Sequence, residues 1–182
     1  MLKFEIVLVS SLNQNCCVCW CDETQQGVVI DPGEAAAVAN VVAERNIDLK
    51  YILLTHNHFD HTLGADELGN RFQIPIVSSF RNDLVGESNE IRFGKQTMNV
   101  LHCPGHTPEH LVFVNHQAKW LFTGDTLFNG DVAKSDFWNS DFSELIESIH
   151  RKLLPLTQYA FVPGHGSCST IECQLSLNPF CK

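Results

Sequence analysis

Four apolar, strand-like runs in this sequence each end at a turn that carries histidine or aspartate. The turn after the first run, Thr55-His56-Asn57-His58-Phe59-Asp60-His61, holds four such side chains within six positions. The other three runs lead into Pro104-Gly105-His106, Gly124-Asp125 and Pro163-Gly164-His165. The first motif stands between a strand-like and a helix-like segment, which is the structural context a metal-binding turn requires. The pattern predicts a metal site formed by His56, His58, Asp60, His61, His106, Asp125 and His165.

The number and the chemistry of these seven side chains favour two metal ions over one. Imidazole nitrogen and carboxylate oxygen suit zinc, iron and manganese, and three protein ligands leave one position open for water or substrate. Two cations about 3.5–4 Å apart can lower the pKa of a shared water and clamp the attacking and leaving oxygens. We therefore expect a hydrolase with two divalent ions, zinc first and iron or manganese as alternatives, and with Asp125 as the bridging carboxylate.

The other four histidines are interpreted differently, because a histidine that stands alone is more often a surface or packing residue than a ligand. His110 follows the second histidine turn closely, and we expect it to orient a ligand from behind. His102, His116 and His150 are expected at the surface or in packing positions.

Composition indicates a compact enzyme. A chain of 182 residues with 44% apolar content is about one domain with a core of its own, so we expect a single domain over 1–182. The net charge of −9 disfavours nucleic acid and anionic membranes as partners. The start of the sequence lacks the features of a secretory signal and no apolar run reaches membrane-spanning length, which favours a cytoplasmic location.

Eight cysteines occur in the sequence, and for a cytoplasmic chain they predict reduced thiols. Cys17, Cys19 and Cys21 alternate with Val18 and Trp20, so on a strand these three thiols would share one face. Most are expected to be small core residues, although a thiol or metal sensor is the alternative. Cys103 is expected on the wall of the metal cavity and not among the ligands.

Periodicity and turn residues predict mixed strands and helices without repeats or linkers. Asp141 is expected to cap a helix that runs to Leu153, with Glu144 completing a capping box. A hairpin is expected over 90–102 with its turn at Gly94-Lys95. The other expected strands are 3–9, 16–21, 27–31, 51–54, 75–78, 111–115, 119–123 and 160–162. The other expected helices are 34–45, 61–71 and 170–177.

The sequence resembles the metallo-β-lactamase superfamily over nearly its whole length, and within it the glyoxalase II-like hydrolases. The resemblance rests on the metal motif and on these further segments: Gln14-Asn15-Cys16, Ile30-Asp31-Pro32-Gly33, Cys103-Pro104-Gly105-His106-Thr107-Pro108, Gly124-Asp125-Thr126-Leu127-Phe128, Pro163-Gly164-His165-Gly166 and Asn178-Pro179-Phe180. It implies an α/β fold, a four-layer αββα sandwich with the metals at one edge between the sheets. It also implies one metal held by His56, His58 and His106, a second held by Asp60, His61 and His165, and Asp125 between them.

The resemblance implies hydrolysis of a small thioester or ester, such as S-lactoylglutathione or another S-2-hydroxyacylglutathione. Asp60 would orient the nucleophile, and Asp31 would support a ligand, although Asp31-Pro32-Gly33 is equally well explained as a strand-ending turn. Three departures bear on the substrate. Few residues follow His165, where glyoxalase II carries a helical extension that contacts glutathione; Glu109 replaces a usual glycine; and Lys134 stands where arginine is common, at the expected substrate rim.

Other classes remain as alternatives. A persulfide dioxygenase with one mononuclear iron resembles glyoxalase II and carries the same motif. The β-lactamases of the superfamily usually depart from this ligand set, either with cysteine at the position of Asp125 or without the bridge, and its nucleases carry basic surfaces. A non-enzymatic sensor built on Cys17, Cys19 and Cys21 is a third class, and the oligomeric state is not determined by these residues.

Overall fold

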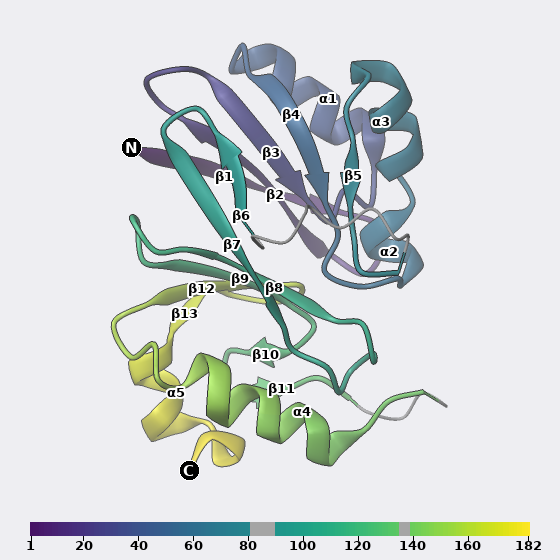
Figure 1. Ribbon diagram of the computed structural model, residues 1–182. Coiled ribbons are helices and arrows are strands. Elements are labelled where there is room, and N and C mark those ends of the chain that lie inside the picture. Colours follow the sequence, from purple (N-terminus) through teal and green to yellow (C-terminus); the bar gives the residue numbers. More distant parts are fainter. Residues whose placement is uncertain (81–89, 135–138) are drawn as a thin grey trace.

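The computed structural model describes residues 1–80, 90–134 and 139–182, and its strands form two large sheets (Figure 1). The first sheet has the order β1 (Leu2–Val9), β2 (Gln14–Cys21), β3 (Gln26–Ile30), β4 (Asp48–Leu53) and β5 (Ile76–Val77). The second has the order β13 (Ser169–Thr170), β12 (Ala160–Pro163), β9 (Trp120–Gly124), β8 (Leu111–Asn115), β7 (Gln96–His102) and β6 (Glu90–Phe93). A two-stranded ribbon pairs β10 (Leu127–Phe128) with β11 (Asp131–Val132).

Helices cover the outer face of each sheet, which confirms the predicted αββα sandwich (Figure 1). The first sheet packs on α1 (Ala35–Glu44) and α3 (Ala65–Phe72), and the second packs on α4 (Phe142–Ser148) and α5 (Ile171–Leu177). A π-helical turn (Ile149–Leu153) continues α4, a 3-10 turn (Pro179–Cys181) follows α5, and α2 (Phe59–Thr62) is one turn long. None of the helices in these described ranges combines the length and apolarity needed to cross a membrane.

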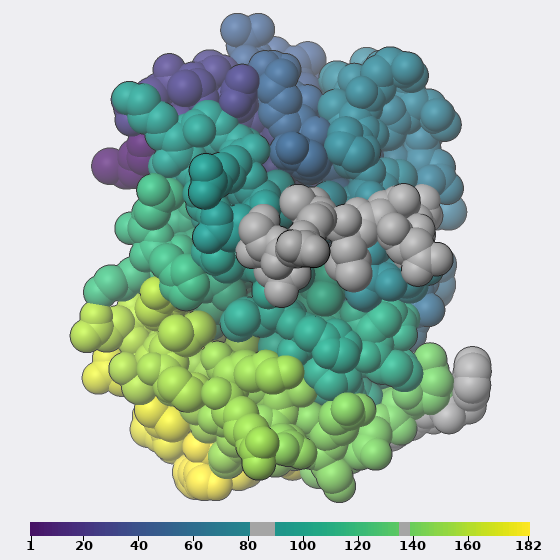
Figure 2. All heavy atoms as spheres, viewed as in Figure 1, coloured from purple at the N-terminus to yellow at the C-terminus, as the bar shows by residue number. Residues whose placement is uncertain are grey.

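Three apolar clusters fill the spaces between these layers. One lies between the first sheet and its helices, one between the two sheets, and one between the second sheet and α4 and α5. In the space-filling view, the purple-to-blue N-terminal part and the green-to-yellow C-terminal part lie at opposite ends and meet along a teal middle (Figure 2). The layer between the sheets is also built from both halves of the sequence, since it holds Cys17 and Leu53 as well as Phe113 and Val162.

Strand β2 is buried on both faces, which explains its continuous run of apolar residues and cysteines. Cys17 and Cys19 share the face toward the second sheet, in agreement with the predicted alternation, whereas Cys16 and Val18 face the helices. Burial raises the pKa of the Cys17 and Cys19 thiols well above the ordinary value, so neither is a ready nucleophile. Cys17 and Cys19 therefore pack as small apolar residues. At the end of the strand burial acts against a charged Cys21, but hydrogen bonds from Thr24 and from the backbone outweigh it and lower the pKa of Cys21 to about 7.

The prediction of one continuous helix over 61–71 is wrong, because the structure has two helices there, α2 and α3. Gly64 separates them, and its N–H donates to Pro32 O (2.9 Å) instead of continuing the first helix. A Cβ at Gly64 would lie 2.6 Å from Ala35 N and 2.7 Å from Pro32 O. The break lets the chain pass directly against the start of α1, a tertiary contact that local periodicity does not reveal.

For the start of α4 the structure confirms the predicted N-cap but not the predicted capping box. Asp141 accepts a hydrogen bond from Glu144 N (3.0 Å), which confirms Asp141 as the N-cap. The Asp141 N–H donates to Gly105 O (2.7 Å), so it is not available to Glu144 and the capping box is not formed. This bond joins α4 to the turn that carries His106. The last predicted turn, which ends at Leu153, is π-helical.

Gly105 provides a test of this junction. Its φ is +136°, and a Cβ there would lie 2.3 Å from Leu145 Cα, whereas at Gly130, with φ +84°, a Cβ would meet nothing within 4 Å. Because Gly105→Ala adds a backbone clash to the strain of positive φ, we expect it to lower the free energy of unfolding by about 3 kcal/mol or more. Gly130→Ala isolates the strain alone, about 1 kcal/mol. Urea unfolding followed by circular dichroism measures both, and equal losses would contradict this account.

Candidate metal centre

The seven side chains predicted as ligands come together at one edge of the sandwich, although they stand on turns far apart in the sequence. The turns follow β4, β7, β9 and β12, and α2 carries two of the residues. The His56 ring centroid lies 4.6 Å from that of His58, 4.2 Å from that of His61 and 5.0 Å from that of His106. The His61 and His165 rings are 5.4 Å apart. Four strand ends therefore converge on one site.

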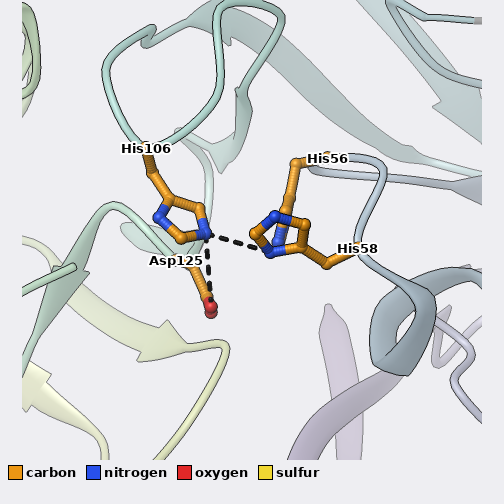
Figure 3. A group of neighbouring side chains, drawn as sticks. All are labelled: His56, His58, His106 and Asp125. Carbon is orange, nitrogen blue, oxygen red and sulfur yellow. Dashed lines mark hydrogen bonds and ion pairs between the residues drawn. The ribbon is translucent and has the colours of Figure 1, made fainter. Parts of the chain in front are cut away.

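Four of these residues form a first group, which Figure 3 shows: His56, His58, His106 and Asp125. Each offers one ligand atom, and these atoms all lie within 4.8 Å of one another. His106 Nε2 is 3.2 Å from His58 Nδ1 and 3.7 Å from Asp125 Oδ2. Three imidazoles and a carboxylate at this spacing suit a divalent cation.

A second group consists of Asp60, His61 and His165. Asp60 Oδ2 lies 3.3 Å from His165 Nε2 and 3.7 Å from His61 Nε2. Asp125 stands between the groups, because its Oδ1 is 3.5 Å from His61 Nε2 and its Oδ2 is 3.7 Å from His165 Nε2. Its carboxylate can thus contact both groups, as the predicted bridge requires.

Hydrogen bonds behind His56 and His61 fix which ring nitrogen faces the cluster. The Asp31 carboxylate can only accept, so His61 Nδ1–H donates to Asp31 Oδ2 (2.9 Å). The Thr55 hydroxyl donates to the same oxygen (2.6 Å) and therefore accepts from His56 Nδ1–H (3.0 Å). Both rings present Nε2 to the cluster. Asp31 also lies near His56 and His61 as a possible ligand, but these bonds make it a supporting carboxylate.

Two backbone carbonyl groups orient His106 and His165 in the same way. His106 Nδ1–H donates to Lys134 O (2.9 Å), and His165 Nδ1–H donates to Leu12 O (3.2 Å). Each ring therefore directs its Nε2 toward Asp125. Lys134, predicted at the substrate rim, lines the pocket and contributes its carbonyl group to the site.

Buried polar atoms at the cluster fit a bound cation. Among the described residues, His56 Nε2, His61 Nε2 and Asp125 Oδ1 are buried and have no hydrogen-bond partner. Such atoms cost free energy unless something pairs with them. Once His61 Nε2 is deprotonated, all three are electron-pair donors at one cluster, so a divalent cation is the partner that their chemistry favours.

Burial and neighbouring side chains also determine the charge of His56 and His61. Burial lowers the pKa of His56 well below its ordinary value, and the neighbouring His61 and His110 rings lower it further. Burial also disfavours a charged His61, but Asp31 outweighs that effect and raises the pKa of His61 to about 9. His56 is therefore a neutral donor, whereas a cation must displace a proton from His61 Nε2.

His110 lies behind the cluster, where the sequence predicted a supporting residue. Its ring stacks on His56, with centroids 4.9 Å apart and planes at 21°. Asp125 N–H donates to His110 Nε2 (3.2 Å), so the ring proton is on Nδ1 and is donated to Thr126 Oγ1 (3.1 Å). Burial lowers the pKa of His110 well below its ordinary value, so the ring is neutral.

A pocket of about 420 Å³ opens over the cluster. Its described lining consists of Leu12, His58, Phe59, Asp60, His106, Asp125, Phe128, Ala133, Lys134 and His165. Five of the seven predicted ligands are thus accessible from the pocket, while His56 and His61 lie beneath them. The arrangement is that of a metal site whose open side faces a small substrate.

Comparison with known proteins agrees with this geometry. The profile of the metallo-beta-lactamase superfamily matches residues 12–79 and 80–165. The chain belongs to this superfamily.

Individual members of the superfamily resemble the chain over most of its length. A hydroxyacylglutathione hydrolase of Haemophilus influenzae is 33% identical, with 98% of each chain covered. The mitochondrial persulfide dioxygenase of Mus musculus is 32% identical over 86% of this chain and 66% of that protein. The crystal structure of the BLEG-1 B3 metallo-beta-lactamase matches with a TM-score of 0.90 and 27% identity, covering 100% of this chain and 99% of that one. The chain spans 66% and 54% of the hydroxyacylglutathione hydrolases of Bdellovibrio bacteriovorus and Psychromonas ingrahamii.

The structure also places the residues that the sequence assigned elsewhere. His102, His116 and His150 lie outside the cluster, as predicted, and bond Pro108 O, the Tyr159 hydroxyl group and Phe180 O respectively. The prediction for Cys103 is wrong: its side chain is fully buried in the apolar layer under α4 and does not line the pocket. The strand before the turn directs it to the opposite face from the site.

Several supporting residues of this superfamily site were missed by sequence reasoning. Asn15 Nδ2 donates to Pro163 O (2.9 Å) and Gly166 O (2.8 Å), which fastens the loop that carries His165. A Cβ at Gly164 would lie 2.1 Å from Asp125 Oδ1, so glycine is required there. The Pro-Gly-His motif could have indicated that glycine is required at position 164. Nothing near Asn15 in the sequence indicates its contacts with Pro163 and Gly166.

His110 offers a test of how Asp125 is held. His110→Leu leaves the buried Asp125 N–H without an acceptor, so we expect zinc affinity to fall about 10- to 100-fold. His110→Gln can accept through Oε1 and donate through Nε2, so it should retain most of the affinity. Competition with a chromophoric chelator measures both variants, after circular dichroism has shown that each is folded. Parental affinity in the leucine variant would show that His110 does not position Asp125.

Proposed function

We propose that this protein is a dinuclear metal-dependent hydrolase that cleaves S-2-hydroxyacylglutathione, such as S-lactoylglutathione, or a related small thioester. The observation that carries the proposal is the pair of ligand groups with Asp125 in reach of both, beneath an open pocket. The Haemophilus influenzae relative, named a hydroxyacylglutathione hydrolase, supports the substrate class. We favour zinc because it is commonly bound by three or four imidazole and carboxylate ligands, as each group here provides. A cytoplasmic location stays a prediction.

The residues divide into those that hold the metals and those that hold the ligands. In this proposal one ion is bound by His56, His58 and His106. The other is bound by Asp60, His61 and His165, with Asp125 between the two groups. Divalent ions bound there would supply Lewis acidity at the substrate carbonyl and lower the pKa of water. Asp31, Thr55 and His110 keep the ring nitrogens and Asp125 aligned through the bonds described above.

Asp60 receives a second role. Its side chain lines the pocket, yet the residue is only 6% exposed, so its carboxylate is held at the floor and not at the rim. We assign Asp60 Oδ2 the acceptance of a hydrogen bond from the attacking water, which fixes the direction of attack on the thioester carbonyl.

A second candidate is a persulfide dioxygenase, because the mouse enzyme of that name is 32% identical to this chain. That activity requires one redox-active iron. The imidazole and carboxylate donors of the first ligand group, His56, His58, His106 and Asp125, suit such an ion without the second group. Oxygen consumption with glutathione persulfide separates it from hydrolysis.

The proposal predicts that zinc-loaded protein hydrolyses S-lactoylglutathione and that Asp60→Asn lowers kcat/KM by about 100-fold or more. Thiol release measures the rate. Asp22→Asn is the matched control, because Asp22 is an exposed carboxylate in the turn after β2, and it should have parental activity. Absence of turnover in zinc-, iron- and manganese-loaded protein would refute the glutathione thioester assignment. Oxygen consumption with glutathione persulfide by the iron-loaded protein would establish the second candidate instead.

A further inference from the structure

The walls of the pocket differ in character from its floor. The floor consists of metal-type side chains, whereas the walls carry Leu12, Phe59, Phe128 and Ala133. Among the described lining residues, Lys134 is the single lysine or arginine side chain. A small polar substrate would have few partners on such walls, so their chemistry bears on which thioester enters.

Phe59 and Leu12 are exposed without a packing reason. Phe59 is 68% exposed and Leu12 is 52% exposed, and neither belongs to the three apolar clusters that form the core. Phe59 is the first residue of α2 and stands between His58 and Asp60. Large apolar side chains that gather at the mouth of a pocket indicate a surface that a ligand covers.

These walls are fixed relative to the cluster. Leu12 O accepts the hydrogen bond that orients His165, so this bond ties the loop between β1 and β2 to that ring. The Phe128 ring centroid lies 6.4 Å from that of His165, with the planes at 74°. Leu12, Phe59 and Phe128 therefore line the same pocket directly beside the cluster.

We infer that the pocket selects thioesters by an apolar acyl chain, longer than lactoyl, that packs on Leu12, Phe59 and Phe128. The inference rests on the proposed thioesterase function. The acyl half is favoured over the thiol half because glutathione carries two carboxylates and an amine, which need polar partners and gain nothing from these walls. The hydroxyl group of a lactoyl chain gains nothing from contact with apolar walls, whereas an alkyl chain loses only contact with water.

Glutathione thioesters of one leaving group and different acyl chains test the inference. From S-butyrylglutathione to S-hexanoylglutathione the chain gains two methylene groups, and we expect kcat/KM to rise about 10-fold, since each buried methylene group is worth roughly 3- to 4-fold. In the double variant with Leu12→Ala and Phe59→Ala the ratio should fall to about 1–2, because the wall has been removed. Leu177→Ala is the matched control, because Leu177 is also 68% exposed but lies at the end of α5, and it should keep the parental ratio.

A binding measurement keeps the test independent of turnover. The thioethers S-butylglutathione and S-hexylglutathione cannot be hydrolysed, and calorimetry on the metal-loaded protein should show the hexyl compound to bind about 10-fold more tightly. Equal kcat/KM for the two thioesters, or a ratio that persists in the double variant, would overturn the inference while leaving the thioesterase proposal standing. If no thioester is hydrolysed, the thioesterase proposal fails, and equal affinities for the two thioethers would then overturn the apolar wall as well.

Discussion

The site depends on one buried carboxylate, that of Asp31. It accepts hydrogen bonds from Thr55 N (2.7 Å), from the Thr55 hydroxyl group and from His61 Nδ1, while its own N–H donates to Leu53 O (2.9 Å). These bonds join the ends of β3 and β4 to α2, so two histidines are oriented by one side chain. Asp31 adopts φ +52°, an uncommon conformation for a residue other than glycine, and its bonds compensate for that strain.

The second sheet supplies the complementary half of the site by close approach of backbones. Gly164 N–H donates to Gly124 O (2.8 Å), which places the turn with His165 beside the turn with Asp125. Because a Cβ at Gly164 would strike Asp125 Oδ1, the absence of a side chain is what allows the two turns to meet. Asn15, from the first sheet, then bonds the same loop from the other side. Asp125, which we propose as the bridging carboxylate, is thus held where both sheets contribute.

Local patterns in the sequence were sufficient to predict mixed strands and helices and the residues that gather, whereas the αββα sandwich was predicted only from the resemblance to the superfamily. Turns that carry ligands follow apolar strands, and the spacing from His56 to His61 is itself a structural motif. The residues that orient the ligands through hydrogen bonds could not be predicted in the same way. Thr55 and Asn15 act through contacts with residues distant in the sequence, and the two-residue strands such as β10 are too short to show a period. The break at Gly64 and the buried position of Cys103 were missed because tertiary packing decides them.

Leu12 shows how this architecture can separate chemistry from specificity. Its carbonyl group orients His165, whereas its side chain forms part of the pocket wall, so a substitution there changes the wall and leaves the hydrogen bond to the ring in place. Phe59 is similar, because its backbone sets the spacing of His58 and Asp60 while its ring stands at the mouth. In both cases the ligand geometry is specified by the main chain and the substrate contact by the side chain. The metal floor can therefore stay constant while the preferred acyl group changes through a few exposed positions.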